Sequence, residues 1–321
     1  MNALLMRFRK RENRVNHMKG AVNHIFFTII FFVLAVYAVS LITLLLWAFI
    51  TSLKTNADYV NNPFSLPAAG TNVLANYIAV FEKFHVKGTA SYFVNGKLIT
   101  HKYDVNFLGM LFNSLIYAGF GSVIQAVVPA VVAYILCKYD FKFSKFVYGV
   151  ALITYIIPIV GNYPSVVVVM QNLGLYDSFI GNFIQKFNFA GMYFFIYYAF
   201  FEGISNSYIE AAELDGASQF QILTRIILPQ AKNIIFTVIV IIFVQLWNDY
   251  QTPLLYLPSH PTIAYGVHYI TTQADNTSAL NLRDTTVRLA SCMSLAVPTL
   301  LMFIFLKEKL MSNLSMGGLK E

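Results

Sequence analysis

Apolar residues in this chain gather in long blocks instead of alternating with polar ones. Several blocks reach the roughly 20 residues that a helix needs to cross the hydrocarbon core of a bilayer. The pattern predicts an all-α polytopic membrane protein with six transmembrane helices. The predicted spans are residues 25–50, 107–136, 146–171, 189–206, 233–255 and 287–306. The first block is longer than the roughly 7–15 apolar residues of a secretory signal, so it predicts a retained span.

The composition agrees with a chain that lies largely in lipid. Hydrophobic residues make up 57% and charged residues 12%, whereas soluble domains carry about 25% charged residues. The net charge of +7 could serve nucleic-acid binding, but six of the 22 lysines and arginines lie within the first 19 residues. A basic cluster in front of a span is typical of a cytoplasmic anchor. We therefore expect no nucleic-acid partner.

The distribution of basic residues predicts how the chain crosses the membrane. Segments that are cytoplasmic when the amino terminus lies inside carry 14 lysines and arginines, and the opposite segments carry seven. Short cytoplasmic loops are enriched in these residues, so we expect both termini in the cytoplasm. The inner segments are 1–24, 137–145, 207–232 and 307–321, and the outer segments are 51–106, 172–188 and 256–286.

The long outer loop, residues 51–106, contains a hairpin signal. The β-prone runs Ala90–Val94 and Lys97–Thr100 flank Asn95-Gly96, and both turn residues tolerate positive φ. We predict a small exterior β-hairpin. It is either a loop decoration or a docking surface for an external partner, and the sequence leaves both open.

Prolines interrupt the third predicted span. Pro158 and Pro164 enclose Gly161, Asn162 and Tyr163. Missing amide donors leave carbonyl groups without helical partners, which membranes tolerate where neighbouring helices or a water-filled cavity satisfy them. Asn162 and Tyr163 are therefore candidates for lining a substrate pathway, and a packing kink is the alternative.

The inner loop between the fourth and fifth spans parses as two short helices, at about 206–215 and 218–228. Gly216 ends the first, since glycine readily adopts the left-handed conformation after a helix. Pro229 halts the second helix or starts the next span. We expect one apolar face of the second helix to be buried, made of Phe220, Leu223 and Ile227.

This loop resembles the "EAA" signature of ABC importer permeases. The matching positions are Glu210, Ala211, Ala212, Gly216, Ile226, Leu228 and Pro229. The string from Ala211 to Ser218 is similar to the carbohydrate-importing branch, particularly the smaller permease of maltose-type systems. Further similarities lie at Asn113–Leu115, Leu173–Ser178, Trp247–Leu254 and Gly317–Lys320. The segment at about 86–104 is longer than the resemblance leads us to expect.

The resemblance implies a type I ABC importer transmembrane domain in residues 107–306 of a prokaryotic cytoplasmic membrane protein. The EAA loop, 207–229, then docks on a cytoplasmic ATPase dimer, with Asp215 among its contacts. Expected further partners are a second, homologous permease and an extracytoplasmic solute-binding protein. The chain has no G-x-x-x-x-G-K-[ST] phosphate loop, so ATP and Mg²⁺ are expected in the ATPase and no cofactor in this chain.

Sugars bind through aromatic faces and hydrogen-bonding side chains, which the end of the fifth span supplies. The candidates for a substrate pathway there are Trp247, Asn248, Asp249 and Tyr250. A carboxylate at membrane depth is costly, and Arg288 is a candidate partner for Asp249. The alternative is an interfacial belt of aromatic residues at the lipid headgroups.

Other classes of function remain as alternatives. A permease for another polar solute is the nearest, and an ion-coupled secondary transporter is more distant, because no internal repeat or mid-membrane ionisable cluster is evident. A membrane-embedded enzyme needs a metal or carboxylate constellation such as H-E-x-x-H, which the sequence lacks. The sequence does not predict which sugar is carried.

Overall fold

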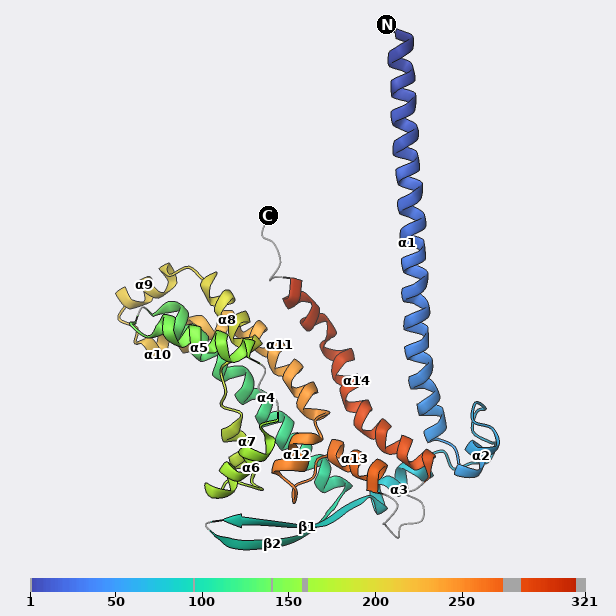
Figure 1. The fold of residues 1–321 in the computed structure, drawn as a ribbon, viewed down its shortest axis with the longest axis vertical. Helices are drawn as coiled ribbons and strands as arrows, with labels where there is room; N and C mark the ends of the chain where they lie inside the picture. The colour runs from blue at the N-terminus through green and yellow to red at the C-terminus, as the bar shows by residue number, and fades with distance from the viewer. Residues whose placement is uncertain (1, 95, 140, 158–160, 274–283, 316–321) are drawn as a thin grey trace. The chain divides into compact units, whose positions relative to one another are not determined.

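The computed structural model describes residues 2–94, 96–139, 141–157, 161–273 and 284–315, and is mostly helical (Figure 1). The chain divides into two units, residues 1–73 and 74–321.

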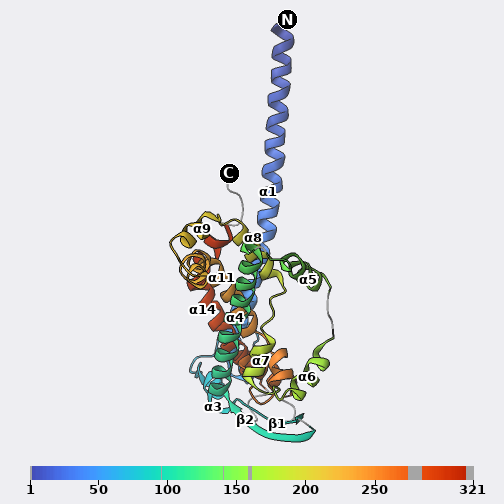
Figure 2. The ribbon, with the colours of Figure 1, turned by 90° about the vertical axis from the view of Figure 1, so that its left-hand side faces the viewer.

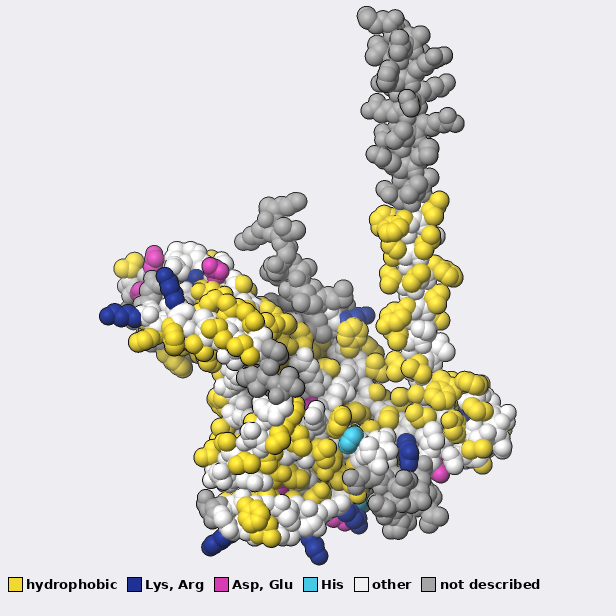
Figure 3. All heavy atoms as spheres, in the orientation of Figure 1, with side chains coloured by type: hydrophobic (Ala, Val, Ile, Leu, Met, Phe, Trp, Pro, Cys, Tyr) yellow, Lys and Arg dark blue, Asp and Glu magenta, His cyan; other side chains and the backbone are white. Residues whose placement is uncertain are grey.

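The first unit consists mainly of one long helix, α1 (Asn2–Ser52). Its residues from His24 to Ser52 are long and apolar enough to cross a membrane. Large apolar side chains are exposed along this stretch (Figure 3), among them Phe31 at 73% and Phe49 at 44%. A helix that is apolar all round is stable in lipid and not in water, which agrees with the first predicted span.

A turn follows α1 and holds a buried amine. The Lys54 Nζ donates hydrogen bonds to the Asn62 carbonyl at 2.9 Å and to Ser65 Oγ at 3.2 Å. Trp47 Nε1 donates to the Pro63 carbonyl at 3.1 Å. The short helix α2 (Asn56–Asn61) lies inside this turn, with Thr55 as its amino-terminal cap. These bonds close the loop on itself at the end of the span.

The second unit is a helical bundle with a two-stranded sheet at one end. Figures 1 and 2 place the hairpin and α9 at opposite ends of this unit. Its elements are α3 (Ala75–Lys83), β1 (His85–Val94), β2 (Lys97–Asn106), α4 (Phe107–Lys138), α5 (Ser144–Ile156), α6 (Tyr163–Asn172), α7 (Phe179–Gln185), α8 (Met192–Glu202), α9 (Ser207–Leu214), α10 (Gln219–Gln221), a π-helix (Ile222–Ile227), α11 (Leu228–Trp247), α12 (Gln251–Tyr256), α13 (Ile263–Gln273) and α14 (Thr285–Ser315).

Four of the six predicted spans correspond to helices that are long and apolar enough to cross a membrane. Within the described residues these helices are 24–52, 107–138, 219–247 and 285–307. The third prediction, 146–171, is met by two shorter helices, α5 and α6. Gly161 lies between them with φ of +81° and Pro164 lies in the first turn of α6, while Pro158 lies outside the described residues. The break therefore falls where the prolines predicted it.

The fourth and fifth predictions were too long. For the fourth, 189–206, the helix α8 has 11 residues, because it begins only after Gly191 and ends at Gly203, and glycine is a poor helix former. For the fifth, 233–255, the helix α11 already ends at Trp247. Beyond it Asp249 accepts a hydrogen bond from the Thr252 amide at 3.1 Å, which starts α12 instead.

Small residues recur at every fourth position of α4 and form its buried face. Ala118, Ser122, Ala126 and Ala130 are each at most 1% exposed. The helices α8 and α11 pack against α4. In lipid, helices associate through close packing, which small residues permit. The stripe of Ala118, Ser122, Ala126 and Ala130, which we call the α4 seam, is therefore the centre of the unit.

The predicted hairpin is present and longer than expected. β1 and β2 pair antiparallel from His85↔Asn106 to Val94↔Lys97. Gly96 in the turn has φ of +77°, as the sequence predicted, and Asn95 lies outside the described residues. The Asn106 side chain caps α4 by accepting from the Gly109 amide at 2.8 Å, so the sheet leads directly into the central helix.

We predict that Ala126→Leu disrupts the α4 seam. Ala126 is fully buried, and extra methylene groups in a packed core cost about 1–3 kcal/mol. The midpoint of thermal unfolding in detergent should fall. Val123→Leu is the control, since Val123 is 46% exposed on the same helix. Equal midpoints for the two variants would contradict the packing.

Candidate functional site

The inner loop predicted from the sequence forms a tight corner at one end of the second unit. Helix α9 ends at Leu214, and the amide of Gly216 donates to the Glu213 carbonyl at 3.0 Å. Gly216 has φ of +78°, in the left-handed region that glycine favours. Among the described residues, no atom lies within 4 Å of a Cβ added at Gly216. The backbone conformation, and not a lack of space, thus requires glycine here.

The second helix of the loop is longer than predicted. Ser218 and Gln221 form a reciprocal capping box at its start, and the helix then runs through the π-helix into α11 as one rod from Gln219 to Trp247. Pro229 does not stop it. The Leu228 amide donates to the Leu223 carbonyl, five residues back. This wider π turn lets the helix continue past Pro229, which has no amide hydrogen to donate.

The widened turn also changes which side chains are buried. Ile222 and Ile227 are fully buried and Leu223 is half-buried, whereas Phe220 is 73% exposed. The predicted burial of Phe220 was therefore wrong, because a π turn shifts the helical register on which that prediction relied. Ile226 and Leu228 are half-buried and Pro229 is exposed.

Side chains from the end of α4 hold the loop in place. Lys138 Nζ donates to the Ile204 carbonyl and to Asn206 Oδ1, the latter at 2.9 Å. The Tyr139 hydroxyl donates to Gln219 Oε1. Gln219 Nε2 in turn donates to Glu213 Oε1 at 2.7 Å. These bonds tie both arms of the loop to each other and to the central helix.

The side of the loop that faces away from the unit is exposed. Glu210, Ala211, Asp215 and Gly216 are exposed, and Leu214 is 90% exposed. Of the predicted coupling residues on α9, Ala212 alone is buried, against the unit itself. An exposed apolar side chain between carboxylates on a braced corner is a surface suited to a protein partner.

A second polar cluster lies toward the hairpin end of the unit. The Tyr117 hydroxyl on α4 donates to Asp249 Oδ2 at 2.7 Å. Lys186 Nζ donates to the same hydroxyl at 3.3 Å and lies 4.5 Å from the centre of the Tyr117 ring. Lys186 is 6% exposed and Tyr117 is fully buried. The cluster ties α4, the end of α7 and the corner after α11 together.

The predicted pairing of Asp249 with Arg288 was wrong. The Asp249 carboxylate is engaged by the Tyr117 hydroxyl and the Thr252 amide. The Nε of Arg288 is buried and has no hydrogen-bond partner within the described residues. Lys186 lies near Asp249 instead, joined to it through the Tyr117 hydroxyl. The sequence shows Lys186 only as a basic residue in a predicted outer loop, which does not indicate this contact.

The other predicted pathway residues make contacts in different parts of the unit. Trp247 is 3% exposed and its Nε1 donates to the Leu295 carbonyl at 3.0 Å, so its indole packs inside the unit. Asn248 bonds to the Val244 carbonyl at 2.8 Å. Tyr250 stacks on His268 with ring centres 4.2 Å apart. Asn162 and Tyr163 are exposed.

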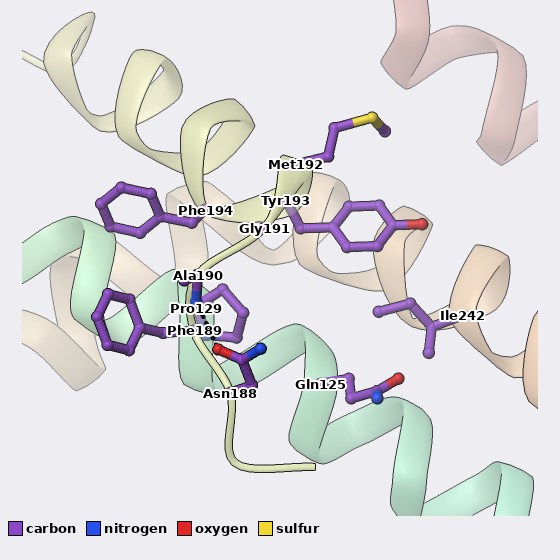
Figure 4. Close-up of a pocket in the computed structure, with 10 residues that line it drawn as sticks. All are labelled: Gln125, Pro129, Asn188, Phe189, Ala190, Gly191, Met192, Tyr193, Phe194 and Ile242. Atoms are coloured by element: carbon purple, nitrogen blue, oxygen red, sulfur yellow. Dashed lines mark hydrogen bonds between the residues drawn. The ribbon is translucent and has the colours of Figure 1, made fainter. Parts of the chain in front are cut away.

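A cavity of about 250 Å³ lies between α4, α11 and the segment that enters α8 (Figure 4). Mostly apolar walls with a few polar groups are typical of small-molecule sites. The lining residues are Gln125, Pro129, Asn188, Phe189, Ala190, Gly191, Met192, Tyr193, Phe194 and Ile242. Asn188 Oδ1 accepts from the Ala190 amide at 3.0 Å, which shapes the segment. None of these residues was among the pathway candidates predicted from the sequence.

The family model described as "Binding-protein-dependent transport system inner membrane component" matches residues 126–307. Over 210 residues the chain is 26% identical to the melibiose/raffinose/stachyose import permease protein MelC of Bacillus subtilis, covering 65% of this chain and 74% of MelC. Over 209 residues it is 27% identical to the sn-glycerol-3-phosphate transport system permease protein UgpE of Agrobacterium fabrum, covering 65% and 68% of the two chains.

A solved structure shares the fold. It is a bacterial ABC transporter involved in the import of the acidic polysaccharide alginate. The match has a TM-score of 0.68 at 20% sequence identity and covers 92% of this chain and 97% of that one. The arrangement of helices is therefore that of an ABC importer's membrane domain.

We predict that Tyr117→Phe destabilises the protein, whereas Tyr197→Phe does not. Both side chains are fully buried, but the Tyr197 hydroxyl has no hydrogen-bond partner within the described residues. Removing the Tyr117 hydroxyl leaves Asp249 and Lys186 with one bond fewer, at a cost of about 1–3 kcal/mol. Thermal unfolding in detergent measures both, and an equal effect would contradict the role of the cluster.

Proposed function

Because the chain belongs to the family of binding-protein-dependent transport system inner membrane components, we propose that it is an ABC importer permease for a sugar or oligosaccharide. ATP hydrolysis takes place in a separate subunit, since the chain is a transport component and carries no phosphate-loop motif. The partners are an ATPase dimer, a second permease and a solute-binding protein.

The braced corner around Gly216 is the observation that carries this proposal. An ATPase that closes on ATP must push on something rigid for its motion to reach the membrane. Lys138, Tyr139 and Gln219 brace the corner, and its second arm continues without interruption to Trp247. Glu210, Ala211, Ala212, Asp215 and Gly216 form the proposed contact, and Ile226, Leu228 and Pro229 fix the arm in the unit.

We propose that the loop end faces the cytoplasm and the hairpin end faces outward. Lysines and arginines are enriched in the two terminal tails and in segments 137–145 and 207–232, which supports this orientation. Both termini are then cytoplasmic. The protein is a multi-pass protein of a prokaryotic cytoplasmic membrane.

A sugar is the proposed substrate. The names of MelC and of the alginate transporter support it, and the cavity beside Gln125 and Tyr193 offers an amide and aromatic rings (Figure 4). Asn162, Tyr163 and Tyr250 are exposed and remain pathway candidates, together with Asn248 and Asp249. Trp247 is buried and bonded to the Leu295 carbonyl, so we propose that it stabilises the end of α11 beside these candidates. The second candidate is another polar solute, which the similarity to a glycerol-3-phosphate permease favours.

Reconstitution tests the proposal. The chain, its partner permease and the ATPase would be placed in lipid vesicles, and ATP hydrolysis measured with the solute-binding protein and a panel of ligands. We expect oligosaccharides to stimulate hydrolysis and to be taken up. Stimulation by glycerol phosphates alone would replace the sugar with the second candidate, and a lack of ATP-dependent uptake for any ligand would contradict the importer function.

We predict that Gly216→Val abolishes coupling. A β-branched residue at φ of +78° is strained, and a left-handed conformation costs about 1–2 kcal/mol for residues with a Cβ. Uptake should fall at least about tenfold, with weaker co-purification of the ATPase. Gly216→Asn should retain most uptake, because asparagine tolerates this conformation.

Gly203→Ala is the matched control for the Gly216 variants. Gly203 has φ of −72°, which any residue adopts, and an added Cβ meets atoms no closer than 3.4 Å. Its uptake should equal that of the unmodified protein. Normal uptake by Gly216→Val would show that the corner does not transmit the motion.

A further inference from the structure

The hairpin of β1 and β2 is anchored through one of its faces. Side chains at alternate positions point toward the unit, where Val86 is fully buried and Ala90 is 5% exposed. Tyr92 contacts Tyr176, which follows α6, with ring centres 4.9 Å apart. The Tyr103 hydroxyl lies 3.4 Å from the Tyr265 hydroxyl on α13. The inner face is thus fixed to elements at the hairpin end of the bundle.

The base of the opposite, outer face is closed by an ion-pair cluster. Asp104 Oδ2 lies 2.9 Å from Lys87 Nζ, and Asp104 Oδ1 lies 2.7 Å from His85 Nδ1. Hydrogen bonds from Lys87 and His85 lower the pKa of the Asp104 carboxyl. Every charge at the base therefore has a partner on the hairpin itself.

The middle and tip of the outer face are available. The Ser91 and Thr100 hydroxyls bond to each other across the strands at 3.3 Å. At the tip Phe93 lies opposite Leu98, and the two are 57% and 60% exposed. Figure 3 shows lysine or arginine side chains beside hydrophobic ones along this edge of the unit.

Lys102 lies on the outer face, two positions beyond Thr100, whereas Lys97 lies at the tip opposite Val94, on the other face. Lys97 and Lys102 are exposed and form no ion pair with the described residues. An apolar centre with a polar rim is the composition of a protein-binding patch. The surface made of Ser91, Phe93, Leu98, Thr100 and Lys102, which we call the outer patch, therefore combines an apolar anchor with net positive charge.

We propose that the outer patch is a docking surface for the importer's solute-binding protein, through an acidic surface of that protein that bears an apolar pocket. The inference rests on the proposed function, which requires such a protein at the end opposite the coupling loop. Because the inner face contacts Tyr176 and Tyr265, a partner held on the outer patch is coupled directly to α6 and α13. The hairpin is then a working part of the importer and not a decoration of the loop.

The test uses the complete importer in lipid nanodiscs together with its solute-binding protein, and follows ATP hydrolysis. The measured quantities are the half-maximal concentration of binding protein and the maximal rate. For the double variant Phe93→Ser, Leu98→Ser, we expect the half-maximal concentration to rise at least about tenfold, because a few central anchors carry most of the binding energy of an interface. For Lys102→Glu we expect a rise of several-fold that shrinks at high salt. Maximal and basal rates should not change.

Ile180→Ser is the matched control, since Ile180 is 70% exposed on α7 and lies outside the hairpin. It should leave the half-maximal concentration unchanged. A value for the double variant within twofold of that for the unmodified importer would overturn the docking role. If the binding protein fails to stimulate even the unmodified importer, the proposed function itself is contradicted, so the two failures differ.

A Phe93→Trp variant distinguishes a protein partner from the lipid surface. Its added fluorescence, measured against the unmodified importer, should shift to the blue when the binding protein is added and should be insensitive to brominated lipids. Quenching by brominated lipids without a response to the binding protein would assign the outer patch to the membrane surface and overturn the proposal.

Discussion

The close approach of helices along the α4 seam is the constraint on which the rest of the structure depends. Inside a bilayer no water drives apolar helices together, so packing must come from small residues that let backbones meet. With Ala126 and its neighbours at the seam, α8 and α11 pack on α4. The two ends of α4 then hold the functional regions, since Lys138 braces the loop and Asn106 joins the hairpin to the helix.

The sequence predicted the features that depend on local chemistry. Blocks of apolar residues gave the membrane class, Asn95-Gly96 gave the hairpin, and Gly216 gave the corner of the loop. These signals are local because a turn or a span needs particular residues at particular places. The approximate location of the break in the third span followed from its prolines for the same reason.

What the sequence could not predict depends on contacts between distant segments. Lys186 and Asp249 are 63 residues apart, and only the fold brings them to the Tyr117 hydroxyl. The exposure of Phe220 depends on a π turn, which no periodicity rule anticipates. The cavity beside Gln125 is likewise assembled from three separate segments.

The π turn before Pro229 sets the rotational phase between the loop and the span. Each helical residue advances the side-chain direction by about 100°, and a π turn inserts about one extra residue into its turn. The side chains of α10 are therefore rotated about the rod axis relative to where a regular helix would put them. The direction in which α10 presents Phe220 thus depends on six residues, Ile222–Ile227. Loss or gain of one residue in that stretch would turn the presented face without altering any residue on it.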